Sequence, residues 1–254
     1  MTSPSPLWYA SRGLGLVLLL VLTGSVVLGV LTVQRWRPGG AGFLANGLHR
    51  NLALIAMPLL ALHGLAVWLD PFAGVRLQDL VVPFAASYRP LWLGLGVLAG
   101  EVSIAVVVTS LLRLRLGYGV WRFVHWGSYV AWPLALLHGL GTGSDTRAGW
   151  TLAIYLLAAG AVLVAVLVRL LSGRARSRWT VALALVSIVA AVAIGVFTWL
   201  GPMQAGWARA AGTPTKLLSH GGAANVILPP VPIGAVGERL QWGRAARVGE
   251  PWPP

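Results

Sequence analysis

The chain has 254 residues, of which 57% are hydrophobic and only 10% are charged, and its mean hydropathy is +0.78. This composition excludes a soluble domain of this size and predicts an integral membrane protein whose first partner is the lipid bilayer. The net charge of +13 comes mostly from short loops between apolar runs, so it predicts an orientation in the membrane and no nucleic-acid partner. The lack of cysteine excludes disulfides, iron–sulfur clusters and thioether-attached heme.

Six apolar runs are each long enough to cross a membrane as a helix. In chain order they lie at about 13–33, 48–69, 91–112, 121–140, 150–171 and 180–200. After about residue 201 the composition changes to Gly, Pro, Ala and Arg, which is too poor in apolar periodicity for a separate core. The sequence therefore predicts an all-α, polytopic bundle of six transmembrane helices over 1–201. An extended Pro/Gly-rich extracytoplasmic tail is expected over 202–254.

The loops between the six runs differ in charge. Ten arginines and no acid flank the first, third and fifth connections, whereas aspartates balance the arginines of the second and fourth. Because positively charged loops stay in the cytoplasm, this pattern predicts a multi-pass protein of the plasma or inner membrane with both termini outside. The second and fourth runs then cross in the same direction, from the cytoplasm outward.

Four histidines occupy these two parallel runs in matched pairs. His49 and His63 are fourteen positions apart, and His125 and His138 are thirteen apart. At 1.5 Å per residue each separation is roughly 20 Å, so each run places one imidazole near each face of a hydrocarbon core about 30 Å thick. His49 then lies level with His125, and His63 with His138. Two imidazoles facing each other within apolar walls suit a six-coordinate heme iron, and interhelical packing of the histidines is the alternative.

The fourth run needs a local change of helix geometry to hold two ligands. At about 100° per residue His63 returns to within roughly 40° of the direction of His49, but His138 points about 140° away from His125. Pro133 lies between these last two histidines and removes a backbone donor, so we expect a kink there to correct the direction. Ordinary tolerance of proline in a membrane helix is the alternative.

Three further residues are candidates for supporting roles. Arg50 and Arg122 stand near the cytoplasmic histidines and are candidates to contact heme propionates, with snorkelling to the membrane surface as the alternative. Glu101 is the only carboxylate placed within a run. Because an acid is costly in lipid, we expect it to face the bundle interior. There the alternatives are a protonated side chain, a hydrogen bond to a polar neighbour such as Ser103, or a place in a proton path.

The two histidine-bearing runs resemble the ferric reductase-like transmembrane domain. That domain is shared by NADPH oxidases, ferric reductases and the heme subunit of the bacterial periplasmic methionine sulfoxide reductase system. The resemblance covers about 13–171 and rests on the histidine spacing. It implies two b-type hemes, an inner one between His49 and His125 and an outer one between His63 and His138. Electrons would cross from a cytoplasmic reductant to an extracytoplasmic acceptor.

The chain departs from the oxidases and ferric reductases after the histidine runs. Where they continue into a cytosolic flavin- and nicotinamide-binding domain, this chain has a sixth apolar run and the tail. We therefore expect a separate electron donor, namely a flavoprotein, a quinol or a free flavin, and an external acceptor or partner reached through the tail. One alternative is a heme-containing anchor that docks a soluble oxidoreductase, so enzymatic activity of the chain itself stays open. The other is a proton-coupled transporter without heme.

Overall fold

The computed structural model describes residues 5–33, 42–171 and 178–218, and no strand occurs among them. Five of its helices are long and apolar enough to cross a membrane: α1 (Pro6–Val33), α2 (Gly42–Leu69), α3 (Pro90–Leu111), α7 (Gly149–Leu171) and α8 (Arg178–Leu200). The shorter helices are η1 (Leu77–Leu80), α4 (Arg113–Leu116), α5 (Tyr118–His125), α6 (Ser128–Thr142), α9 (Trp207–Ala210) and α10 (Thr215–Leu218). An all-helical, multi-pass membrane architecture is thereby confirmed. Helices suit these apolar runs because they satisfy every backbone hydrogen bond within the segment.

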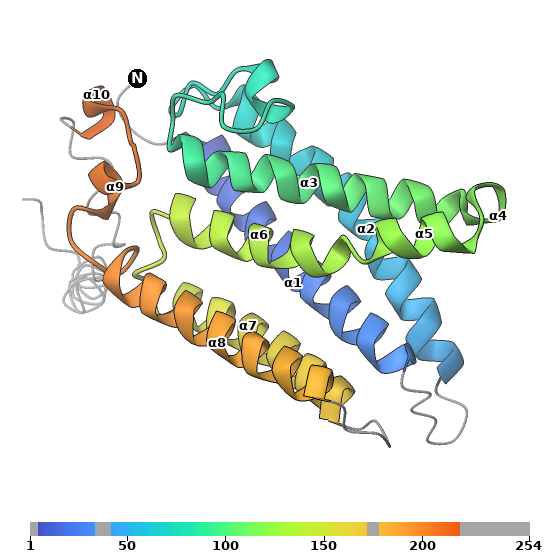
Figure 1. Cartoon of the computed structure of the whole chain (residues 1–254). Coiled ribbons are helices and arrows are strands. Elements are labelled where there is room, and N and C mark those ends of the chain that lie inside the picture. The colour runs from blue at the N-terminus through green and yellow to red at the C-terminus, as the bar shows by residue number, and fades with distance from the viewer. Residues whose placement is uncertain (1–4, 34–41, 172–177, 219–254) are drawn as a thin grey trace, which may run out of the picture. The chain divides into compact units, whose positions relative to one another are not determined.

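The helices pack in neighbouring pairs (Figure 1). α1 and α2 are antiparallel, since Ser11 near the start of α1 contacts His63 and Ser25 further along contacts His49. α3 packs against α6 and, further along, against α5, while α7 packs against both α1 and α8. α1 also contacts α6. The pair formed by α1 and α2 therefore lies next to the pair formed by α3 and α6, which places the histidines of α2 near those of α5 and α6.

The fourth predicted run, at 121–140, is not one continuous helix but two, α5 and α6. The helix breaks at Trp126 and Gly127. There Gly127 N donates to Val124 O at 2.8 Å and Val130 N donates to Gly127 O at 2.9 Å, each spanning three residues instead of four. Such turns hold fewer residues than α-helical turns, so they rotate the segment that follows. A Cβ on Gly127 would lie 2.8 Å from Val124 O, which explains why glycine occupies this position.

The change of direction expected at Pro133 therefore occurs before it, and α6 continues through the proline. Two contacts fix α5 and α6 along α3. Near the end of α3, Trp121 Nε1 donates to Ser110 Oγ at 3.2 Å, and near its start His138 Nδ1 contacts Trp92 O at 2.9 Å. The broken element thus follows nearly the full length of α3 in the opposite direction.

The segment after α8 packs against the bundle, although the sequence places the start of an extended tail at residue 202. Trp207 of α9 packs on Trp92 of α3 and on Phe197 of α8, with ring centroids 5.3 and 5.7 Å apart. This aromatic contact anchors α9 beside the first turns of α3. The remainder of the predicted tail, 219–254, lies outside the described residues.

Candidate functional site

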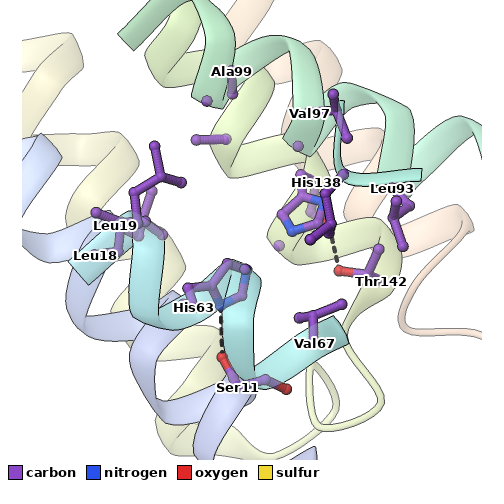
Figure 2. Close-up of a pocket in the computed structure, with 18 of the residues that line it drawn as sticks. Ser11, Leu18, Leu19, His63, Val67, Leu93, Val97, Ala99, His138 and Thr142 are labelled. Carbon is purple, nitrogen blue, oxygen red and sulfur yellow. Dashed lines mark hydrogen bonds between the residues drawn. The ribbon is translucent and has the colours of Figure 1, made fainter. Parts of the chain in front are cut away.

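The structure brings the four histidines together as two facing pairs. His49 of α2 faces His125 at the end of α5, with ring centroids 6.1 Å apart and ring planes at 78°. His63 of α2 faces His138 of α6, with centroids 6.2 Å apart and planes at 86° (Figure 2). These are the same two pairs that the sequence places at common depths.

The spacing within each pair suits one metal ion held between two imidazoles. A metal–imidazole bond is about 2 Å long and the ring centre lies about 1 Å beyond the nitrogen, so two opposed ligands have centres about 6 Å apart. Among the described residues no group of three or more His, Cys, Asp or Glu side chains is placed to hold a metal ion. The other coordination positions would therefore need a non-protein ligand, and the four nitrogens of a porphyrin supply them.

Backbone carbonyl groups orient three of the four imidazoles. Each of these rings places its Nδ1 within hydrogen-bond distance of one carbonyl oxygen: His49 with Ser25 (2.8 Å), His63 with Ser11 (2.9 Å) and His138 with Trp92 (2.9 Å). Because a carbonyl oxygen can only accept, Nδ1 carries the proton and donates it. Nε2 then keeps its lone pair for an iron, which is the usual arrangement of a metal-binding histidine.

His125 is oriented differently from the other three histidines. Its Nδ1 is buried and has no hydrogen-bond partner among the described residues. Its ring instead stacks on Trp121, with centroids 5.1 Å apart and planes at 30°. His125 is also the last residue of α5, directly before the break in the helix. Its direction is therefore set by aromatic stacking and by the end of α5.

Glycine backbones provide the surfaces on which three of the imidazoles lie. A Cβ built on each glycine would approach the nearest imidazole atom closely: 3.2 Å from Gly15 to His63, 3.1 Å from Gly29 to His49 and 2.4 Å from Gly96 to His138. The first two distances are tight, and the third is shorter than any real contact. A side chain at Gly96 would therefore displace the imidazole. The sequence alone did not indicate that these glycines belong to the site.

A cavity of about 770 Å³ surrounds the pair formed by His63 and His138. This volume is within the range of sites for small ligands and cofactors, roughly 300–1,000 Å³. The walls come mainly from α1, α2, α3 and α6 and are largely apolar; those labelled in Figure 2 include Leu18, Leu19, Val67, Leu93, Val97 and Ala99. Such walls exclude water from a macrocycle. The cavity and its two imidazoles together fit a heme.

Arg12 of α1 adds a positive charge to the wall of this cavity. It donates to Thr142 O at 3.1 Å and forms a salt bridge with Asp145. Its Nε is buried without a hydrogen-bond partner among the described residues. A buried donor that lacks an acceptor suits an anionic group such as a propionate. Arg12 was not predicted from the sequence, because a single arginine near the start of an apolar run carries no distinctive pattern.

The two arginines proposed from the sequence lie on the helices of the other histidine pair. Arg50 follows His49 on α2, Arg122 precedes His125 on α5, and both side chains are exposed. The guanidinium of Arg122 lies over the rings of Tyr118 and Trp126, at 5.8 and 5.4 Å from their centroids. These cation–π contacts occupy the Arg122 side chain at the end of the bundle that carries His125.

Glu101 lines the cavity wall on α3, and its side chain is exposed. The hydrogen bond expected between Glu101 and Ser103 does not occur in the described structure. Instead Ser103 Oγ donates to Ala99 O, one helical turn earlier, at 2.7 Å. Glu101 is therefore in contact with the cavity but is not held by that neighbour.

Comparison with models of protein families, with curated proteins and with solved structures finds no match to this chain. Its function is therefore inferred from its own residues. The two facing histidine pairs and the cavity around one of them are the features on which that inference depends.

Proposed function

We propose that this protein is a diheme b-type electron carrier that passes electrons across a membrane. One observation carries the proposal. At each of two levels of the bundle two imidazoles face each other, with ring centroids 6.1 Å apart in one pair and 6.2 Å apart in the other. Heme b bound at each level would supply reversible one-electron chemistry. The protein's own residues would hold the iron from both sides, exclude water and fix the separation of the two sites.

In this proposal α5 and α6 together form the fourth crossing of the membrane, which brings the number of crossings among the described residues to six. Neither helix is long enough alone, but they follow α3 from its end to its start. A break within a crossing is tolerated where neighbouring helices satisfy the freed backbone groups, and α3 covers this one. The break also allows His125 and His138 to point toward α2 together, whereas in a regular helix they would point about 140° apart.

The charge distribution supports an orientation with His49 and His125 on the cytoplasmic side. Arginines 50, 113, 115 and 122 lie close in the chain to this pair, whereas Asp79 and Asp145 lie in the connections on the side of His63 and His138. By the positive-inside rule the arginine-rich end faces the cytoplasm and both termini lie outside. His49 would then belong to the inner heme site and His63 to the outer one.

The separation of the two sites suits electron transfer without a large protein motion. His49 and His63 are fourteen positions apart on α2, which is about 20 Å along the helix axis. Because a porphyrin extends beyond its iron, the gap between macrocycle edges is shorter. Electrons would therefore enter at the inner site, pass to the outer site and leave to an extracytoplasmic acceptor, as in the ferric reductase-like proteins that the sequence resembles.

The electron donor in this proposal is a separate flavoprotein or a quinol from the membrane. The described residues contain no strand, so they include no sheet of the kind that binds a flavin or nicotinamide dinucleotide. A second function is favoured by the packing of Trp207 on Trp92, because the carbonyl oxygen of Trp92 contacts His138 and the segment after α8 thereby lies near this histidine pair. There the protein could serve as a heme-containing anchor that docks an extracytoplasmic oxidoreductase through residues beyond 218.

Electron transfer in sealed, oriented vesicles tests the proposed function. A reductant confined to the cytoplasmic side should reduce both hemes, and an impermeant ferric chelate outside should reoxidise them. In His63→Ala the inner heme should still be reduced but should no longer pass electrons outward at the wild-type rate. Unchanged transfer in His63→Ala would refute the path. Heme reduction without reoxidation by ferric chelates, quinones or oxygen would favour the anchor, and a spectrum without heme would favour the transporter.

A further inference from the structure

Two side chains converge on one carbonyl oxygen near the end of α6. Nε1 of Trp207 donates to Gly141 O at 3.1 Å, and Nη1 of Arg89 donates to the same oxygen at 2.9 Å. Arg89 also reaches the segment after α9, because its Nε donates to Thr213 Oγ1 at 2.9 Å. Through these bonds the segment that follows α8 is fastened to α6. We call Trp207, Arg89, Gly141 and Thr213 the clamp.

Arg89 is an unusual residue to find at this position. Its side chain is 1% exposed and, within the described part of the chain, forms no ion pair with a carboxylate. Its backbone has a φ of 44°, which few residues other than glycine adopt, directly before Pro90 begins α3. A buried charge with neutral acceptors and a strained backbone both cost free energy, so surrounding contacts must hold them in place. Such features occur often at functional sites.

Trp92 connects the clamp to His138. The Trp92 ring packs on Trp207 at 5.3 Å and stacks on Phe197 at 5.0 Å. It also lies directly against Gly141, where an added Cβ would be 2.1 Å from the indole. The carbonyl oxygen of the same residue accepts the proton of His138 Nδ1 at 2.9 Å. One tryptophan therefore contacts the clamp with its ring and orients the imidazole with its backbone.

We propose that Trp207 is a positioning residue for His138, acting through Trp92 and Gly141. By holding the start of α3 against the end of α6, it would set the strength of the hydrogen bond between His138 Nδ1 and Trp92 O. This inference rests on the proposed function, in which His138 is an iron ligand. A strong Nδ1–H hydrogen bond makes imidazole a better electron donor and so stabilises ferric iron. Weakening the bond should therefore raise the reduction potential of the heme at His138.

The other histidine pair provides an internal reference. In the described structure His49 Nδ1 contacts Ser25 and the His125 ring stacks on Trp121, and neither histidine takes a hydrogen bond or ring contact from the clamp. A change confined to the clamp should thus affect one heme and leave the second unchanged. General destabilisation of the bundle would instead affect both.

Redox titration of purified protein, followed by absorption and EPR, tests the inference. Trp207→Leu removes both the indole N–H and the ring contact, while Trp207→Phe removes the N–H but keeps an aromatic ring. Thr213→Val removes the acceptor of Arg89 Nε and offers a milder change if Trp207→Leu fails to fold. Trp199→Leu is the control, because Trp199 is 66% exposed on α8. Each variant is also made in a His125→Ala background, in which the heme at His63 and His138 is expected to remain alone.

We expect Trp207→Leu to shift the midpoint potential of the His63–His138 heme to a more positive value and to change its ferric EPR signal. Trp207→Phe and Thr213→Val should give smaller shifts of the same sign, and Trp199→Leu should give none. Two hemes in the wild-type protein with potentials unaffected by Trp207→Leu, or shifted equally, would overturn this inference alone. A wild-type protein that binds no heme would overturn the proposed function together with it.

Discussion

Gly96 and His138 meet where α3 packs on α6, with no room for a side chain between them. A Cβ on Gly96 would lie 2.4 Å from Nδ1 and 2.6 Å from Cε1 of the imidazole. One turn earlier on α3, Trp92 O accepts the Nδ1 proton of the same ring at 2.9 Å. The backbone of α3 thus supplies both the surface and the hydrogen bond that fix the direction of His138.

Gly96→Ala should therefore displace His138 and remove one heme. Overpacking of this kind costs about 1–3 kcal/mol, so we also expect a lower thermal midpoint. The heme-to-protein ratio and the EPR spectrum measure the outcome, and the surviving heme should be that of His49 and His125. Gly160→Ala on α7 is the matched control, since nothing lies within 4 Å of a Cβ there. A wild-type heme content in Gly96→Ala would contradict this placement of His138.

The angle between the facing imidazoles gives a spectroscopic expectation. The ring planes stand at 78° for His49 and His125 and at 86° for His63 and His138. Two axial imidazoles that are nearly perpendicular leave the iron orbitals close to degenerate, so both ferric hemes should give highly anisotropic low-spin EPR signals. Frozen-solution EPR of the oxidised protein measures this. Rhombic signals typical of parallel imidazole planes would show that the rings turn on binding heme.

The sequence could predict the pairing of the four histidines for two reasons. An imidazole facing lipid is energetically unfavourable, so a histidine within a span indicates a partner, and the spacing within each run shows which histidines lie at the same depth. The sequence also contains a second spacing that indicates the site. Gly15 and Gly29 are fourteen positions apart, as are His49 and His63, and α1 and α2 are antiparallel, so each glycine faces one histidine. Matching spacings on neighbouring apolar runs indicate such contacts. The carbonyl partners of the histidines carry no side-chain signal and needed the structure.

The break in the fourth run was harder to predict. Pro133 is the conspicuous helix breaker, but a proline within a helix can be accommodated by a neighbouring helix, and α6 continues through it. The break lies at Gly127 instead, where an added Cβ would be 2.8 Å from Val124 O and 3.0 Å from Val102 of α3. The contact with α3 is tertiary, so the local sequence could not reveal it.

Because the segment after α8 packs on the bundle, the effect of truncating the chain should depend on whether this segment is kept. A chain that ends after Leu218 keeps every described contact, so it should retain both hemes and nearly the wild-type thermal midpoint. A chain that ends after Gly206 loses Trp207 and the Thr213 hydroxyl that accepts from Arg89. We expect it to unfold at a lower temperature and to lose heme first at His138. Equal midpoints for the two truncated proteins would show that the segment does not stabilise the bundle.

Asp79 should give the loop between α2 and α3 a pH-dependent stability. Its carboxylate accepts from the Arg76 side chain, through Nη2, and from Arg76 N, each at 2.9 Å. The side-chain bond above all holds the pKa of Asp79 below its ordinary value of 3.8. A lowered pKa stabilises the fold above pH 3.8, and the effect is lost as the pH falls through the lower, folded-state pKa. Asp79 is the third residue of η1 and accepts from the backbone N–H of the N-cap residue, so Asp79→Asn should cost about 1 kcal/mol at neutral pH and flatten this acid dependence.

Thermal midpoints measured in detergent between neutral and acid pH compare Asp79→Asn with the wild type. The two curves should converge as the pH falls below 3.8, because protonation of Asp79 then removes the same interaction as the substitution. Curves that stay parallel down to the lowest pH would mean that the Asp79 carboxylate does not stabilise the loop.

The most direct test of the central claim is a count of hemes per chain by pyridine hemochrome analysis. We expect two non-covalent b hemes in the fully loaded wild-type protein and one in each single alanine variant of His49, His63, His125 and His138. The remaining heme should have one spectrum in His63→Ala and His138→Ala, and a second spectrum in His49→Ala and His125→Ala. A count well below two in the loaded wild type, or matching spectra for His49→Ala and His138→Ala, would contradict the account.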